Sequence, residues 1–202
     1  LDAALKNYLE LSKAVPDSSD LNMRIGEVYR RKGDLQSAVT YMQRSSELDP
    51  NNLVPLMQTA TILDEMGRTR EATAAYQKAL QIDTENIVAL NNLAYMQAES
   101  GGDLDLALRY AETAKRKAPS NLQIDDTLGW IYVKKNLNDN ALVIFRDLVK
   151  KQPENATFRY HLGVAYAQRG DTAKAKEELN AALRSNPTSK EAEQIRKVLA
   201  KL

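Results

Sequence analysis

Residues 18–52 read SSDLNMRIGEVYRRKGDLQSAVTYMQRSSELDPNN, and this stretch decides the fold. Apolar and small side chains recur at helical spacing on both sides of Gly33 and Asp34. Gly33 can adopt the left-handed conformation that ends a helix, and Asp34 can cap the next one. Pro50 disfavours a helical conformation in the residue before it. The stretch therefore predicts a helix, a tight turn, a second helix and a closing turn.

The same arrangement recurs along the whole chain. An alanine returns after 34, 34, 35, 34 and 34 residues, at Ala4, Ala38, Ala72, Ala107, Ala141 and Ala175. A proline follows five of these six alanines by twelve residues, and Thr84 takes its place once. A fixed period of this length is typical of helix pairs that bury their apolar faces only against neighbouring pairs. We therefore expect one repeat array without a single globular core, whose function lies on its surface.

Two further positions of the period carry a structural prediction. Each repeat has a small residue at one point of its first helix, where two helix backbones can then approach closely: Gly26, Ala60, Ala94, Gly129 and Gly163. Asn136 stands where other repeats have the turn glycine, and asparagine tolerates a positive φ better than most residues. We therefore expect Asn136 to end its helix as Gly33 does.

The composition excludes several classes of function. The 28 Lys and Arg residues balance the 27 Asp and Glu residues to a formal charge of +1, which does not favour nucleic acid or a membrane surface as partner. No apolar run approaches the roughly 20 residues that span a bilayer, so we expect a soluble chain without direct membrane insertion. The absence of cysteine suits the cytoplasm and the periplasm alike, so the compartment stays open.

No constellation for catalysis, a metal or a cofactor is evident. The chain has one histidine, His161, and no cysteine, which leaves no His/Cys metal site and no thiol nucleophile. His161 adjoins the packing residues Leu162 and Gly163, so we expect it to be structural or to contact a partner. Gly101 and Gly102 lack the spacing of a phosphate loop. The sequence therefore predicts a protein that is not an enzyme and has no catalytic residues, metal or cofactor.

The pattern resembles the tetratricopeptide repeat over essentially the whole chain. In the repeat at residues 122–155 the match rests on Leu128, Gly129, Tyr132, Ala141, Phe145 and Pro153. The resemblance implies an all-α fold, a right-handed superhelical α-solenoid of helix-turn-helix repeats. Residues 1–202 then form a single solenoid domain: the second helix of a truncated repeat (1–18), full repeats at 19–52, 53–86, 87–121, 122–155 and 156–189, and a C-terminal capping helix at 190–202.

The two ends of the array differ in what they predict. Residues 1–18 lack a first helix, so we expect a fragment of a longer protein with an exposed apolar face of Leu1, Leu5, Tyr8 and Leu11. Residues 190–202 have an apolar stripe and a polar face, as expected of the cap that shields the last repeat of a solenoid. We expect this C-terminal end to be a genuine one.

The resemblance also implies a binding groove. In this family the first helix of each repeat lines a concave face, and its second, fifth, ninth, twelfth and thirteenth positions point into the groove. Together with Asn92, the asparagine that the family often has at the sixth position, they give the predicted partner-binding residues: Met23, Glu27, Met57, Thr61, Asp64, Asn91, Asn92, Tyr95, Asp126, Trp130, Tyr160 and Val164. Trp130 is the foremost candidate because its ring suits a protein interface. The alternative is that Trp130 only fills space between adjacent first helices.

These observations favour a non-catalytic scaffold that binds a peptide or helix of a partner protein in the concave groove. The stretches LNNLAYMQAESGGDLDLALRYAETA and DDTLGWIYVKKN are similar to those of bacterial repeat proteins of envelope and secretion systems, so we expect such an assembly as the setting. Two alternatives stay open. The chain could self-associate into a homo-oligomer through its open N-terminal repeat face, or it could be the substrate-presenting arm of a larger enzyme.

Overall fold

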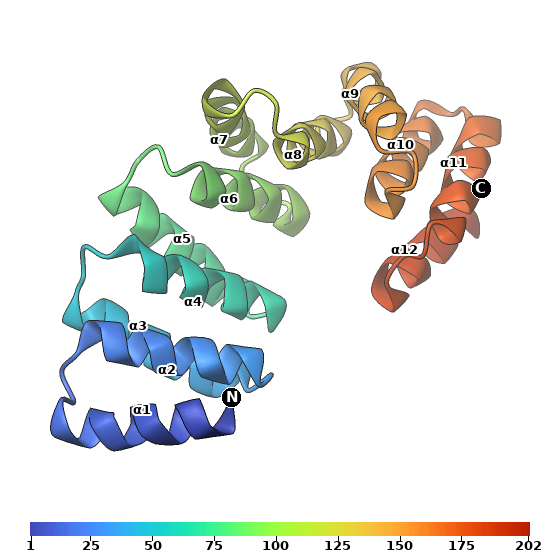
Figure 1. The fold of residues 1–202 in the computed structure, drawn as a ribbon. Helices are drawn as coiled ribbons and strands as arrows, with labels where there is room; N and C mark the ends of the chain where they lie inside the picture. Colours follow the sequence, from blue (N-terminus) through green and yellow to red (C-terminus); the bar gives the residue numbers. More distant parts are fainter. The chain divides into compact units, whose positions relative to one another are not determined.

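The computed structural model describes residues 1–202 and consists of α-helices joined by short turns (Figure 1). The helices are α1 (Asp2–Ala14), α2 (Ser19–Arg31), α3 (Leu35–Leu48), α4 (Leu53–Glu65), α5 (Thr69–Ile82), α6 (Ile87–Ser100), α7 (Leu104–Lys117), α8 (Leu122–Lys134), α9 (Asn138–Lys151), α10 (Ala156–Arg169), α11 (Thr172–Arg184) and α12 (Ser189–Leu199). The predicted all-α fold is confirmed. The chain forms two compact units, Leu1–Leu93 and Ala94–Leu202, here called unit 1 and unit 2.

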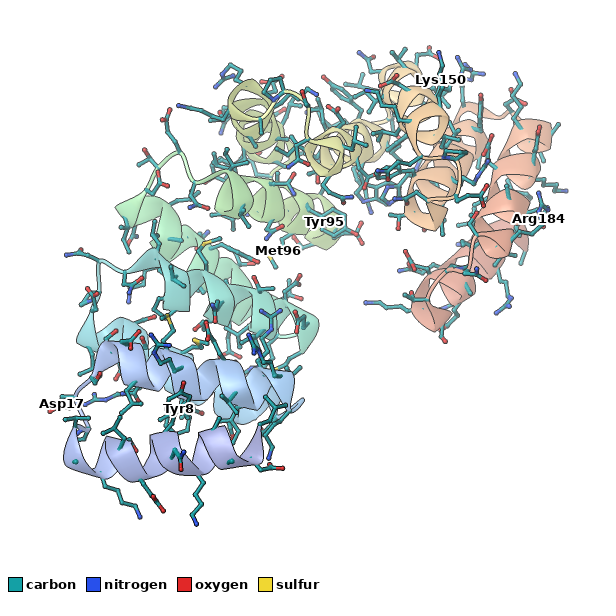
Figure 2. The ribbon with its side chains drawn as sticks, viewed as in Figure 1. Tyr8, Asp17, Tyr95, Met96, Lys150 and Arg184 are labelled. Carbon is teal, nitrogen blue, oxygen red and sulfur yellow. The ribbon has the colours of Figure 1, made fainter.

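Unit 1 holds α1 to α5 and the start of α6. Each helix from α1 to α4 packs against the next one in the chain. The core lies between the helices, where Ile25, Met42, Leu63 and Tyr76 are fully or almost fully buried. Helix α1 buries none of its residues, although Tyr8 lies on the side of α1 that faces α2 (Figure 2). The helix pairs thus stabilise one another in series, as the period predicts.

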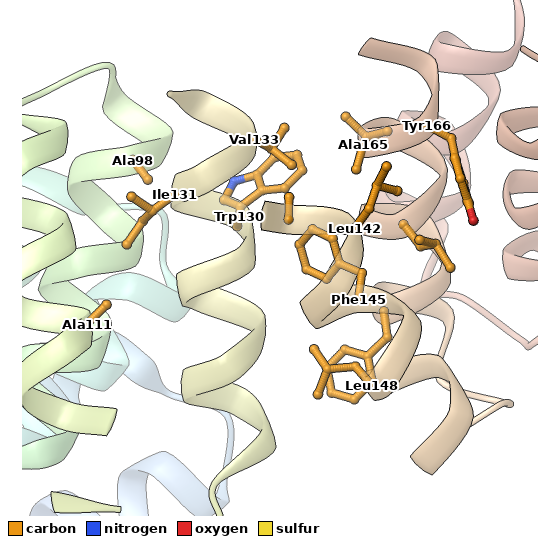
Figure 3. Close-up of a cluster of buried hydrophobic side chains, with 14 of the residues drawn as sticks. Ala98, Ala111, Trp130, Ile131, Val133, Leu142, Phe145, Leu148, Ala165 and Tyr166 are labelled. Carbon is orange, nitrogen blue, oxygen red and sulfur yellow. The ribbon is translucent and has the colours of Figure 1, made fainter. Parts of the chain in front are cut away.

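Unit 2 holds the rest of α6 and α7 to α12. Its core has a large cluster of buried side chains that includes Phe145 and Trp130 (Figure 3), and a smaller cluster of Leu179, Ala182 and Ile195. Helix α12 packs against α10 and α11 and buries Ile195 completely. It begins with a capping box, in which Thr188 accepts a hydrogen bond from the Glu191 backbone N–H while the Glu191 carboxylate accepts one from the Thr188 N–H. The predicted capping helix is therefore present.

The turns follow the punctuation of the sequence. Gly33 has φ of +80° and ends α2, and the Asp34 carboxylate accepts a hydrogen bond from the Ser37 backbone N–H at 3.0 Å to cap α3. Asn136 has φ of +59° at the equivalent place between α8 and α9, which confirms its predicted role as a helix end. Local residue chemistry thus fixes where the helices begin and end.

The small residues of the first helices stand where helices cross closely. A Cβ atom added to Gly26 would lie 3.0 Å from Met42 atoms, and one added to Gly129 would lie 2.7 Å from the ring of Phe145. At Gly163 it would lie 2.6 Å from Leu179. At Gly129 and Gly163 a methyl group would fit only if its neighbours shifted, whereas at Gly26 the flexible Met42 side chain can give way. Small residues at this position thus permit a close approach within each pair. The predicted close crossings are confirmed.

Candidate functional site

The predicted groove residues lie on the first helices of the repeats, α2, α4, α6, α8 and α10. Within each unit, the surface that these helices present is called the first-helix face of that unit. Unit 1 contributes Met23, Glu27, Met57, Thr61, Asp64, Asn91 and Asn92, and unit 2 contributes Tyr95, Asp126, Trp130, Tyr160 and Val164.

In unit 1 the first-helix face has a shallow hollow between α4 and the start of α6. Its volume is about 360 Å³, and its lining is Arg30, Leu53, Val54, Met57, Gln58, Thr61, Asn86 and Val88. Val54 is 50% exposed and Val88 is 54% exposed, so two aliphatic side chains of this lining face water. We call this surface the Val54–Val88 hollow. A surface of this kind favours contact with an apolar side chain.

Val54 and Val88 are not among the partner-binding residues that were predicted from the sequence. Both occupy the second position of their repeats, one of the positions that the family resemblance directs into the groove. The position of the two valines in the repeat therefore already indicated that they could face the groove. The repeats share no residue type at the second position, because the other full repeats have Asp20, Gln123 and Thr157 there.

A polar edge borders the hollow. The Arg30 guanidinium pairs with the Glu65 carboxylate at 2.5 Å, and the Gln58 side-chain amide donates to Glu27 at 3.4 Å. The side-chain oxygens of Gln58 and Asn91 are both buried without a hydrogen-bond partner. A buried oxygen without a donor is costly.

Two of the predicted groove residues in unit 1 are engaged within the chain. The Asn92 amide donates to the Tyr76 hydroxyl at 2.7 Å, and the Thr61 hydroxyl lies 3.3 Å from the same oxygen. Burial raises the pKa of Tyr76, while these two hydrogen bonds act in the opposite direction. Asn92 and Thr61 thus anchor the Tyr76 side chain of α5 beneath the face.

In unit 2 the first-helix face is filled by a cluster of rings. Trp130 stacks on His161 with their ring centroids 4.2 Å apart, and Tyr160 lies 6.1 Å from Trp130. His161 and Asp126 are both buried and share a hydrogen bond of 2.7 Å between Nδ1 and a carboxylate oxygen. The Trp130 indole N–H donates to Glu99 at 2.6 Å. Side chains of α6, α8 and α10 therefore close around Trp130.

Electrostatic contacts reinforce this ring cluster. Partial burial of Glu99 opposes its ionisation, but the indole hydrogen bond from Trp130 and the Lys134 ammonium at 3.0 Å outweigh it and lower the pKa of Glu99. Lys134 also lies 4.9 Å from the centroid of the Trp130 ring, within the range of a cation–π interaction. The arrangement ties Trp130 to charged groups on two helices.

The predicted groove residues of unit 2 thus differ in their exposure. Asp126, Trp130 and Val164 are buried, with Trp130 only 6% exposed, whereas Tyr95 is 39% exposed and Tyr160 is partly exposed. Trp130 fills the space between adjacent first helices, as the alternative interpretation of the sequence describes. Contact of a partner with these residues stays a prediction, with Tyr95 and Tyr160 as the accessible rings.

The structure shows neither a metal site nor a membrane-spanning helix. The structure brings together no group of three or more His, Cys, Asp or Glu side chains that could hold a metal ion. None of its helices combines the length and the apolar character needed to cross a bilayer.

Comparison with known proteins identifies the repeat. Two family models described as tetratricopeptide repeat match residues 17–85 and 127–190. No curated protein matches the chain in sequence.

Solved structures match in fold. A tetratricopeptide repeat protein from Parabacteroides merdae has a TM-score of 0.83 at 19% identity, covering 98% of this chain and 77% of that one. YrrB, described as a TPR protein with an unusual peptide-binding site, has a TM-score of 0.70 at 20% identity, covering 96% of this chain and 100% of its own. MamA has a TM-score of 0.68 at 21% identity, covering 83% of this chain and 91% of its own. At these identities the likeness concerns the fold.

Proposed function

Because the chain belongs to the tetratricopeptide repeat family, we propose that it is a non-catalytic scaffold that binds a peptide or helix of a partner protein along its first-helix face. The observation that carries this proposal is the Val54–Val88 hollow, where aliphatic side chains line a recess of the first-helix face and remain exposed. Covering such side chains removes apolar surface from water, which drives association.

The chemistry around the hollow supports a peptide as the ligand. An apolar side chain of the peptide would fill the recess between Val54 and Val88. Its backbone N–H and C=O groups would meet the polar side chains of the lining, such as Gln58 and Thr61. Apolar pockets combined with main-chain hydrogen bonds are a common way for proteins to recognise peptides.

The other predicted groove residues are also part of this proposal. We propose that Met23, Glu27, Met57 and Asp64 in unit 1, and Tyr95 and Tyr160 in unit 2, contact the same partner or a second one. Asp126, Trp130 and Val164 would act mainly by supporting the surface, because they are buried. The proposed setting is a bacterial envelope or secretion assembly. The structural match to the pilF protein of Pseudomonas aeruginosa, at 16% identity, concerns fold alone.

The test compares aspartate substitutions at exposed aliphatic positions. Val54→Asp and Val88→Asp place a carboxylate in the first turn of a helix, where it is compatible with folding. Leu137→Asp is the matched control, since Leu137 is an exposed aliphatic residue of unit 2 outside the first helices. Immobilised wild-type protein and the three variants, all checked for equal helicity, are incubated with a lysate of the source organism, and retained proteins are quantified by mass spectrometry.

We expect at least one protein that wild type and Leu137→Asp retain equally and that Val54→Asp and Val88→Asp retain at least tenfold less. Retention of the same proteins by all four samples would place the binding surface elsewhere. Failure of the wild type to retain any protein would also contradict the proposal.

A second candidate function is self-association, and the state of α1 favours it. Helix α1 has no buried residue, and Leu1, Leu11 and Val15 are exposed. We propose that a second copy covers this apolar face. Light scattering over a hundredfold concentration range tests it: a mass that rises for the wild type but not for Leu11→Asp supports association. A constant monomer mass excludes it.

A further inference from the structure

Arg146 on α9 is held in place by a tyrosine rather than by a carboxylate. Its Nε donates a hydrogen bond of 2.9 Å to the Tyr166 hydroxyl of α10, and its guanidinium carbon lies 5.4 Å from the centroid of that ring. Tyr166 is itself buried at the edge of the unit 2 core (Figure 3). The guanidinium is thus oriented by a fixed ring, while its two terminal nitrogens remain available as donors.

The surroundings of Tyr166 carry an excess of positive charge. Arg169 and Lys174 each lie 5.6 Å from the centroid of the same ring. Asp171 pairs with both of these cations, and Asp139 pairs with Arg169. Two carboxylates therefore face three cations, and Arg146 is the cation without an ion pair.

The outer surface of α9 extends this positive region. Lys150 follows Arg146 by four residues, is exposed and forms no ion pair (Figure 2). Asp147, the acidic neighbour of Arg146, pairs with Lys151 at 2.6 Å. Arg146 and Lys150 thus project from one side of the helix with their charges uncompensated.

An exposed aliphatic residue lies on the same side of the helix. Val143 precedes Arg146 by three residues and is 69% exposed, the largest value among the large apolar side chains of the chain. Residues spaced by three and four positions share one side of a helix. We call the surface of Val143, Arg146 and Lys150 the α9 face. It combines an apolar contact with two uncompensated cations.

The repeat fold itself does not require an arginine at this position. Five residues after the recurring alanine, the other repeats have Leu9, Gln43, Gln77, Glu112 and Asn180. The Arg146–Tyr166 contact is therefore a particular feature of one repeat and not part of the common packing scheme.

We propose that the α9 face binds an acidic segment of a partner protein, with carboxylates on Arg146 and Lys150 and an apolar side chain over Val143. A guanidinium binds a carboxylate through two parallel hydrogen bonds, and an arginine that is already oriented loses less conformational freedom on binding. Because α9 is the second helix of its repeat, this surface is distinct from the first-helix face. The chain then has two separate docking surfaces with different chemistry.

The test is a fluorescence anisotropy titration with a labelled peptide of about twelve residues built from repeated Glu-Glu-Leu. The reference peptide has Gln in place of every Glu. Arg146→Gln is compared with Arg70→Gln, which removes the same charge from an exposed arginine of α5 in unit 1. Tyr166→Phe keeps the ring but removes the hydroxyl that orients Arg146. All variants are first checked for equal helicity and equal thermal midpoints.

We expect the acidic peptide to bind the wild type and Arg70→Gln equally, and Arg146→Gln about tenfold more weakly. Val143→Ser and Tyr166→Phe should each weaken binding severalfold, and added salt should weaken it in every sample. Equal affinity of Arg146→Gln and Arg70→Gln would overturn the proposal, as would equal binding of the Gln peptide or no binding by the wild type.

Two competitors separate other sources of negative charge. Inorganic phosphate at a few millimolar, or a single-stranded oligonucleotide of the same net charge as the peptide, is added to the complex. Weak competition by both is the expected result. Displacement by phosphate, or tighter Arg146-dependent binding of the oligonucleotide, would replace the acidic protein segment by an anion or nucleic acid site.

Discussion

The first-helix faces of unit 1 and unit 2 are formed by the same repeat positions, but they differ in how accessible their side chains are. In unit 1 the face is open, with Val54 and Val88 exposed beside a recess. In unit 2 it is closed, because Trp130 is covered by His161 on one side and held by Glu99 on the other. A residue at a groove position is therefore not necessarily accessible to a partner. The neighbouring repeats decide whether its side chain stays accessible.

The ninth position of the repeat illustrates this rule. In unit 1 it is Thr61, whose short side chain approaches Tyr76 and leaves the space above it open. In unit 2 it is Trp130, whose large ring reaches both neighbouring first helices. A larger side chain at the same position thus gives more cohesion and a less accessible surface.

The largest expected effect concerns the closed face. Trp130→Ala should lower the free energy of unfolding by about 3–5 kcal/mol, because a buried ring with stacking and hydrogen-bond partners leaves a cavity. Val54→Ala in unit 1 should change it by no more than about 0.5 kcal/mol, since that side chain is half exposed. Urea unfolding followed by far-ultraviolet circular dichroism measures both. Equal losses would mean that the two faces do not differ as described.

The next effect compares the helix crossings. In Gly129→Ala the added methyl group would meet the rigid Phe145 ring at 2.7 Å, and we expect a loss of about 1–3 kcal/mol. In Gly26→Ala the obstacle is the flexible Met42 side chain at 3.0 Å, and alanine favours the helix by about 1 kcal/mol over glycine, so the net change should be small. Thermal midpoints give the order. A loss at Gly26 as large as that at Gly129 would contradict it.

A smaller effect concerns the loss of stability at acidic pH. The pKa of Glu99 is lowered in the folded chain, so its contribution to stability is complete above its ordinary value of 4.5 and is lost as the pH falls through the folded pKa. Glu99→Gln should therefore reduce the loss of stability between pH 6 and pH 3, by less than about 1 kcal/mol because the carboxylate is partly exposed. Urea midpoints at several pH values test this. An identical pH profile for wild type and variant would exclude a role for Glu99.

The smallest expected effect concerns the open face. Val88→Ser should leave the free energy of unfolding unchanged within about 0.5 kcal/mol, since Val88 is 54% exposed. Differential scanning calorimetry measures the change. A drop of several degrees in the midpoint would show that Val88 belongs to the core of unit 1, and would weaken its assignment to a binding hollow.

Much of the fold could be predicted from local chemistry. Gly33 and Asn136 end helices with positive φ, Asp34 caps one, and Gly129 permits a close crossing, each as its residue type indicates. These predictions succeed because backbone conformation and capping depend on a few adjacent residues. The capping helix was likewise evident from its apolar stripe.

Less of the candidate site could be predicted from the sequence. The sequence placed Trp130 and Asp126 on the groove side but gave no sign that His161, 31 and 35 residues away in the chain, would stack on one and bond to the other. It also passed over Val54 and Val88, because an exposed valine and a buried one look alike in a sequence. Burial depends on contacts between repeats, and a repeat period does not specify those contacts.

The period, the helix limits, the turns and the glycine crossings could all be predicted from the residues alone, because each follows from interactions within about one helix pair. The packed structure was needed to show which first-helix residues are buried, where the recess of unit 1 opens, and that Tyr166 orients Arg146. These features arise where side chains of successive helices meet. The exposure of each side chain there is set by the size and charge of residues more than a helix length away in the sequence.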